Sequence, residues 1–275
     1  MIGSARIAKR FQDLKADGRA GLVTFITAGD PNIEISSVIL NQLPEAGADI
    51  IELGMPFSDP MADGPVIQAS SQRALDNGAS MIKTLDMVRN FRKNDSDTPI
   101  ILMGYFNPIY IYGVAKFVTD ATEAGVDGFI IVDLPPEEAE MREPVEQAGL
   151  SFIYLTSPTT DDQRLPVVVE HASGFVYYVS VTGITGTKSA ATQDIKNALE
   201  RLRRHTDLPI VVGFGIKTPE QAAAISQHAE AVVVGSAFVS KVAENLGPDG
   251  RPQDGCAEAV LNLVRDIAGG LSAKN

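Results

Sequence analysis

The chain has 275 residues, of which 44% are hydrophobic and 21% are charged, and its formal net charge is −12. This composition is typical of a globular protein. The acidic balance does not suit nucleic acid or an anionic membrane surface, because those partners need an excess of Lys and Arg. The single cysteine, Cys256, excludes an internal disulfide and a cysteine-based metal cluster. No segment resembles a signal peptide or reaches the length of a membrane span, so we expect a soluble, cytoplasmic protein.

The opening segment has an amphipathic pattern, with Ile7, Phe11 and Leu14 on one side, which predicts a helix ahead of the first strand. From there to the end of the chain, short β-branched runs alternate with longer helical patterns. The eight runs that we interpret as strands are residues 22–27, 49–53, 99–103, 128–132, 151–155, 175–179, 209–212 and 231–234. The helical patterns between them include residues 34–45, 81–92, 114–123, 136–147, 163–171, 192–205 and 219–227.

This alternation predicts the fold class. Strands that alternate with helices form a parallel sheet, and eight such repeats close the sheet into a barrel. Several strand candidates, such as 128–132 and 231–234, are apolar without alternation, as expected for strands buried on both faces. No composition break or low-complexity linker divides the chain. We therefore predict an α/β protein, a single (β/α)8 TIM barrel with an extra N-terminal helix, as one domain over residues 1–275.

A carboxylate lies inside the second predicted strand. Side chains alternate along a strand, so Glu52 shares a face with Ile50 and lies close to the carboxyl end of 49–53. Active sites of such barrels assemble at that end, and burial there raises the pKa of a carboxyl toward neutrality. Glu52 is therefore a candidate proton shuttle. The alternative is a structural carboxylate that loop amides satisfy.

A second carboxylate, Asp63, follows in the long loop after this strand. It precedes Gly64 and Pro65, so by spacing alone it is equally well explained as a cap of the next helix.

Glycine-rich turns follow the last two predicted strands. In many barrels the loops after the seventh and eighth strands bind a phosphate through backbone N–H groups. Gly215, Gly235 and Ser236 occupy these turns, and Gly183 and Gly186, after the sixth strand, would complete the cradle. The alternative is that these glycines serve only the turns themselves.

The residues usual for barrel carbon–carbon lyases are absent from the strands. No predicted strand interior carries a lysine for a Schiff base, since Lys188 and Lys217 lie in loops. The histidines, His171, His205 and His228, lie at helix ends, away from a metal site at the barrel mouth. If the chain cleaves a carbon–carbon bond, the substrate itself must accept the electrons. A protonated indole ring can do so.

The stretch IELGMPFSDPMADGP at 51–65 resembles the signature of tryptophan synthase alpha subunits. The likeness extends over nearly the whole chain and includes residues 25–31, 103–108, 132–135, 181–186, 213–216 and 234–236. The long carboxylate motif is specific to that family, whereas several phosphate-binding barrels share the glycine turns.

The resemblance implies a lyase that cleaves indole-3-glycerol phosphate to indole and glyceraldehyde 3-phosphate. Glu52 would be its proton shuttle, and Asp63 would bind the indole N–H and stabilise positive charge on that nitrogen. Tyr177 matches a pocket tyrosine of the family, although barrel packing explains it as well. The residues implied to line the indole site, each of which packing also explains, are Phe25, Tyr105 and Ile130.

The resemblance also implies a mobile loop and a partner. The loop 182–192, with Thr182, Gly183 and Thr185, would close over substrate. A beta subunit carrying pyridoxal phosphate would condense the released indole with serine, in a heterotetramer of two alpha and two beta subunits, while this chain needs no cofactor or metal. The loop 56–61 would lie near that interface.

Three alternatives remain open at this point. A phosphosugar isomerase, an epimerase or an indole-glycerol-phosphate synthase shares the phosphate turns but leaves Glu52 and Asp63 unexplained. A stand-alone indole-3-glycerol phosphate lyase would need no beta subunit. A catalytically weak subunit would serve mainly to activate a beta protein.

Overall fold

The computed structural model describes residues 3–180, 188–213 and 215–271, with the backbone alone at 188–192. Over these residues, nine short parallel strands form one sheet in the order β5-β4-β3-β2-β1-β9-β8-β7-β6. The strands are β1 (Gly21–Thr27), β2 (Ile50–Gly54), β3 (Ile100–Gly104), β4 (Gly128–Ile131), β5 (Ser151–Phe152), β6 (Leu155–Thr156), β7 (Val176–Val179), β8 (Ile210–Gly213) and β9 (Ala231–Val234). Seven of the eight predicted strands are confirmed to within one residue at each end.

The fifth predicted strand, 151–155, is wrong as a continuous element, because it is divided into β5 and β6. Each half pairs with only one neighbour, β5 with β4 and β6 with β7. The two residues between them still bond to both sides: Ile153 N–H donates to Phe129 O at 2.9 Å, and Tyr154 O accepts from Tyr177 N–H at 3.1 Å. The sheet therefore closes on itself at the break, and the chain is a TIM barrel.

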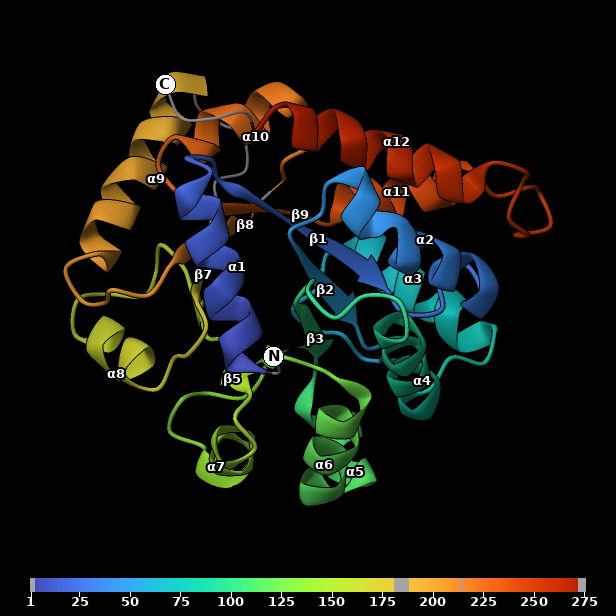
Figure 1. Cartoon of the computed structure of the whole chain (residues 1–275), viewed down its shortest axis with the longest axis horizontal. Coiled ribbons are helices and arrows are strands. Elements are labelled where there is room, and N and C mark those ends of the chain that lie inside the picture. The colour runs from blue at the N-terminus through green and yellow to red at the C-terminus, as the bar shows by residue number, and fades with distance from the viewer. Residues whose placement is uncertain (1–2, 181–187, 214, 272–275) are drawn as a thin grey trace.

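Helices surround the sheet, and α1 lies across one end of it (Figure 1). The helices are α1 (Ser4–Ala16), α2 (Ile33–Ala46), α3 (Pro65–Asp76), α4 (Met81–Arg92), α5 (Phe106–Tyr112), α6 (Val114–Ala124), α7 (Ala139–Gln147), α8 (Arg164–Glu170), α9 (Lys188–Leu202), α10 (Pro219–Ser226), α11 (Ser236–Glu244) and α12 (Cys256–Gly269). Among the described residues, no helix is long and apolar enough to cross a membrane.

Two helices differ from the predicted bounds by three residues or more. Helix α7 begins three residues after the predicted start at 136, because residues 135–138 form a turn in which Glu138 N–H donates to Pro135 O. Helix α9 begins at Lys188, four residues before the predicted start at 192, and ends at Leu202, three residues before the predicted end at 205.

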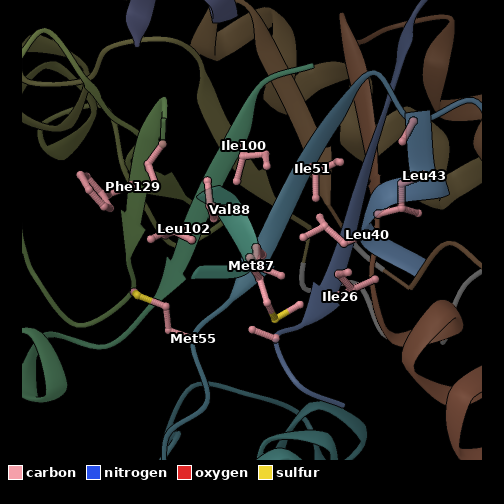
Figure 2. Close-up of a cluster of buried hydrophobic side chains, with 14 of the residues drawn as sticks. Ile26, Leu40, Leu43, Ile51, Met55, Met87, Val88, Ile100, Leu102 and Phe129 are labelled. Atoms are coloured by element: carbon pink, nitrogen blue, oxygen red, sulfur yellow. The ribbon is translucent and has the colours of Figure 1, made fainter. Parts of the chain in front are cut away.

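The core has two layers because strand side chains alternate. Ile50 belongs to the cluster inside the barrel, whereas Ile51 and Leu53 belong to the cluster between the sheet and the helices. Figure 2 shows this outer cluster, in which Ile51 lies near Leu40 and Leu43 of α2.

Helix α1 confirms the predicted N-terminal helix, and it closes the amino-terminal end of the barrel. Its apolar residues Ile7, Phe11 and Leu14 join the inner cluster, where the Phe11 ring meets the Phe175 ring edge-on at 5.9 Å. A charged network holds the helix in place: the Arg6 guanidinium donates to the buried Asp127 carboxylate at the start of β4. With this end closed, the opposite end, where the strands terminate, is left to form a site.

Candidate active site

Glu52 lies in the interior of the barrel on β2. Its register partners are Phe25 of β1 and Ile101 of β3, and it is fully buried. Neither carboxylate oxygen has a hydrogen-bond partner in the described part of the chain. Burial without compensation disfavours the charged form, which raises the pKa of Glu52 to about 8. No amide of the described loops satisfies the carboxylate, as the structural alternative would require.

Asp63 lies in the loop between β2 and α3 and is half-buried. The N-cap residue of α3 is Gly64, with no side-chain capping bond. Asp63 instead accepts a hydrogen bond from the Tyr105 hydroxyl, which itself accepts from Ala62 N–H at 3.0 Å. Burial raises the pKa of Asp63, and the bond from Tyr105 opposes that shift. The carboxylate is thus held by the neighbouring strand end and is not used as a helix cap.

A cavity of about 380 Å³, which we call the main cavity, joins these residues at the carboxyl end of the barrel. Glu52, Asp63, Tyr177 and Phe25 all line it, although they come from three strands and one loop. The main cavity is of the size usual for a small-molecule site.

Tyr177, on β7, lies beside Glu52 and over β8. A Cβ added to Gly213 would lie 2.1 Å from the Tyr177 hydroxyl oxygen, so only glycine at that position leaves room for the ring. Burial, followed by the proximity of Glu52, raises the pKa of Tyr177 well above its ordinary value. The hydroxyl therefore stays protonated and can donate a hydrogen bond into the main cavity.

The predicted phosphate residues Gly215, Gly235 and Ser236 line the main cavity together. Gly215 has φ +53, a left-handed conformation that favours glycine. Ser236 opens α11, whose first backbone N–H groups have no partner within the helix and suit an anion. The other predicted cradle and loop residues, Gly186, Thr182, Gly183 and Thr185, lie outside the described residues.

The three residues predicted to line the indole site do not all line the same cavity. Phe25 lines the main cavity, whereas Tyr105 lines a smaller adjoining cavity that also contains Phe25. Ile130 is fully buried in the inner cluster and lines neither cavity. Its side chain packs inside the barrel, below the site.

Sequence reasoning missed several apolar residues of the main cavity. Met103, Val179 and Val233 lie at or near the carboxyl ends of their strands and point inward, and Ile67 lies in the first turn of α3. The alternation rule that located Glu52 also applies to the three strand residues, because each is an even number of positions from an inner-cluster residue of its own strand. Ile67 carries no such signal.

Comparisons with known proteins agree on one family. A family model described as tryptophan synthase alpha chain matches residues 11–265. A crystal structure of tryptophan synthase subunit alpha from Legionella pneumophila str. Paris is 42% identical, with 98% of each chain covered and a TM-score of 0.88. A structure from Aquifex aeolicus VF5 is 38% identical over 97% of this chain and 99% of that one, with a TM-score of 0.87.

A crystal structure of tryptophan synthase from M. tuberculosis, in an aminoacrylate- and BRD0059-bound form, is 32% identical over 97% of this chain and 98% of that one, with a TM-score of 0.85. The family model covers most of the chain, and these relatives match it over nearly their full length. The chain therefore belongs to the tryptophan synthase alpha chain family.

Proposed function

We propose that this chain splits indole-3-glycerol phosphate with Glu52 as the proton shuttle and Asp63 as the electrostatic partner. As a member of its family, the chain is a lyase of tryptophan biosynthesis. The observation that carries the residue assignment is the fully buried Glu52, whose two oxygens have no partner among the described residues and which shares a cavity with Asp63.

The reaction needs an acid and then a base at one place. With a pKa of about 8, Glu52 is protonated at neutral pH and can deliver its proton to carbon 3 of the indole ring. The ring then carries positive charge on its nitrogen, and the Asp63 carboxylate accepts the N–H hydrogen bond and stabilises that charge. The Glu52 carboxylate next takes the proton of the hydroxyl on the adjoining glycerol carbon. The carbon–carbon bond breaks, its electrons return to the ring, and indole and the aldehyde are released.

Tyr177 and the glycine turns orient the substrate. The Tyr177 hydroxyl lies near Glu52 and stays protonated, so it acts as a hydrogen-bond donor and not as a base. Backbone N–H groups at Gly215, Gly235 and Ser236 bind the phosphate, with the N-terminus of α11 adding its partial positive charge.

We further propose that the partner is a beta subunit, in a heterotetramer of two alpha and two beta subunits. The beta subunit carries pyridoxal phosphate, and this chain, one domain working in the cytoplasm, needs no cofactor. The support is an exposed apolar surface near the site: Met61 is 79% exposed, and Tyr110 and Ile111 of α5 are 62% and 78% exposed. Met61 adjoins Ala62, whose N–H is bonded to Tyr105 at the start of α5.

The test is indole release from indole-3-glycerol phosphate by the wild type and Glu52→Gln, each with and without a beta subunit. We expect slow release by the wild type, faster release with the beta subunit, and a loss of about 10²-fold or more in the variant. Fast wild-type release that the beta subunit does not change would contradict the proposed partner. A folded Glu52→Gln chain that keeps full activity would contradict the role of Glu52.

A further inference from the structure

A second, smaller cavity adjoins the main cavity on the side of Asp63. This satellite cavity has a volume of about 20 Å³ and shares Phe25, Asp63, Ile67 and Met103 with the main cavity. Residues that line only the satellite cavity include Met55 and Val132. Of its lining residues, the proposed reaction uses only Asp63, which borders both cavities.

Two strands end in glycines, and the lack of a side chain at these positions leaves space for the satellite cavity. Gly54 and Gly104 end β2 and β3. A Cβ on Gly54 would lie 2.6 Å from the Phe25 ring, and a Cβ on Gly104 would lie 2.8 Å from the Met55 methyl. Figure 2 shows Met55 at the carboxyl ends of the strands. Because a methionine side chain is flexible, Met55 can move to fit a group that binds in the satellite cavity.

The order of the strands around the barrel determines on which side of a bound substrate the satellite cavity lies. The proposed phosphate residues follow β8 and β9, and in the closed strand order β3 and β4 lie on the opposite side. The ends of β3 and β4 supply Gly104 and Val132 to the satellite cavity. An indole ring whose glycerol phosphate arm extends toward β8 and β9 therefore points its benzene ring toward the satellite cavity.

Two contacts of the substrate determine which position of the indole ring faces the satellite cavity: the phosphate arm on position 3 and the N–H that Asp63 accepts. In indole, position 6 lies farthest from position 3, which carries the arm, and position 7 flanks the N–H that Asp63 accepts. We propose that the satellite cavity receives a single small apolar substituent at position 6, so that this chain also cleaves 6-methyl- and 6-chloro-indole-3-glycerol phosphate. This inference rests on the proposed function, because the pose assumes the roles of Asp63 and the phosphate turns.

The size and lining of the cavity determine which substituents fit. A cavity of roughly 10–15 Å³ already holds a water-sized group, so about 20 Å³ is enough for one methyl or chlorine. Its walls include Met55, Phe57, Pro60 and Val132, which favours an apolar substituent. Burying one methyl group contributes enough binding free energy for a gain of about fourfold.

The test compares release of the indole product from three substrates by the full chain: the parent compound, its 6-methyl derivative and its 4-methyl derivative. We expect kcat/KM for the 6-methyl compound to equal or exceed that of the parent by up to about fourfold, and the 4-methyl compound, whose methyl group lies beside the arm, to lack this gain. This comparison of positional isomers needs no variant. A 6-methyl compound cleaved no better than the 4-methyl isomer would overturn the proposal.

A variant that fills the satellite cavity gives an independent measurement. Val132→Ile adds one methyl group to its wall and should lower the ratio of 6-methyl to parent kcat/KM by about tenfold. The matched control is Val179→Ile, since Val179 lines the main cavity only. The control should leave this ratio unchanged. An unchanged ratio in Val132→Ile would contradict the assignment of the satellite cavity, whereas failure to cleave the parent compound would instead contradict the proposed function.

Discussion

At the scale of single residues, the unusual feature is a buried carboxyl group that has no hydrogen-bond partner in the described part of the chain. Burying an ionisable group among apolar side chains costs free energy, and proteins normally compensate with hydrogen bonds or an opposite charge. Among the residues that the structure describes, Glu52 has neither, although its neighbours on β1 and β3 pack closely around it. The raised pKa follows from this arrangement, and it supplies the proton that the proposed reaction needs.

The same burial makes the stability of the protein depend on pH. The folded chain keeps the Glu52 proton up to about pH 8, whereas the unfolded chain releases it above the ordinary value of 4.5. Ionisation of the unfolded state therefore lowers the free energy of unfolding as the pH rises from 4.5 to 8. Glu52→Gln removes this loss, so its stability relative to wild type should rise between pH 5 and pH 8 by on the order of 3 kcal/mol.

Urea unfolding at the two pH values measures this difference. Glu123→Gln, at an exposed position, is the control and should show no comparable change. A Glu52→Gln chain whose advantage over wild type does not depend on pH would show that the carboxyl is ionised in the folded protein.

At the scale of elements, the loop between β2 and α3 decides where Asp63 lies. Two contacts cross from this loop to Tyr105 at the start of α5: Ala62 N–H donates to the tyrosine hydroxyl, and that hydroxyl donates to Asp63. The Phe57 and Tyr105 rings also pack, with centroids 5.6 Å apart. These contacts hold the loop against the end of the next strand, in addition to hydrogen bonds within the loop such as that from Asp63 N–H to Pro60 O.

Tyr105→Phe should therefore reduce catalysis without removing a reacting group. Loss of a hydrogen bond to a charged partner costs roughly 1.5–3 kcal/mol, so we expect kcat/KM to fall by roughly ten- to hundredfold. The pKa of Asp63 should rise, because the Tyr105 bond lowers it, and the acid limb of the pH profile should move to higher pH. Tyr112→Phe, which removes a hydroxyl bonded to Asp120, is the matched control. An unshifted acid limb in Tyr105→Phe would contradict this link.

At the scale of the whole molecule, the barrel is closed by contacts between distant parts of the chain. The Asp127 carboxylate, fully buried, accepts from Arg6 of α1, from Arg92 at the end of α4 at 2.7 Å, and from Ile100 N–H at 2.9 Å. One residue thereby joins the first helix, the fourth helix and the third and fourth strands.

Asp127→Asn should destabilise the protein strongly, because two guanidinium groups would lose their shared carboxylate. Breaking a buried ion pair by removing one partner costs about 3–5 kcal/mol. The free energy of unfolding in urea, measured at neutral pH, tests this. Asp86→Asn removes an exposed partner of Arg89 and should cost far less. Equal losses in the two variants would show that the buried network adds no particular stability.

The sequence by itself was sufficient for the fold class and for much of the site. Alternating strand and helix patterns predicted the barrel, and the two-residue period of a strand placed Glu52 inside it. These features depend on local periodicity, which neighbouring residues determine. The motif at 51–65 indicated the family, which the comparisons confirmed.

Contacts between segments far apart in the chain decided the rest. Asp63 precedes Gly64 and Pro65 whether it caps a helix or faces a cavity, and only the approach of Tyr105 distinguishes the two. Ile130 shares the inward face expected of a pocket residue, yet it lies too deep in the barrel to reach the cavity. The divided fifth strand and the satellite cavity likewise depend on barrel closure. Burial and partners are properties of the packed chain, and local patterns do not carry them.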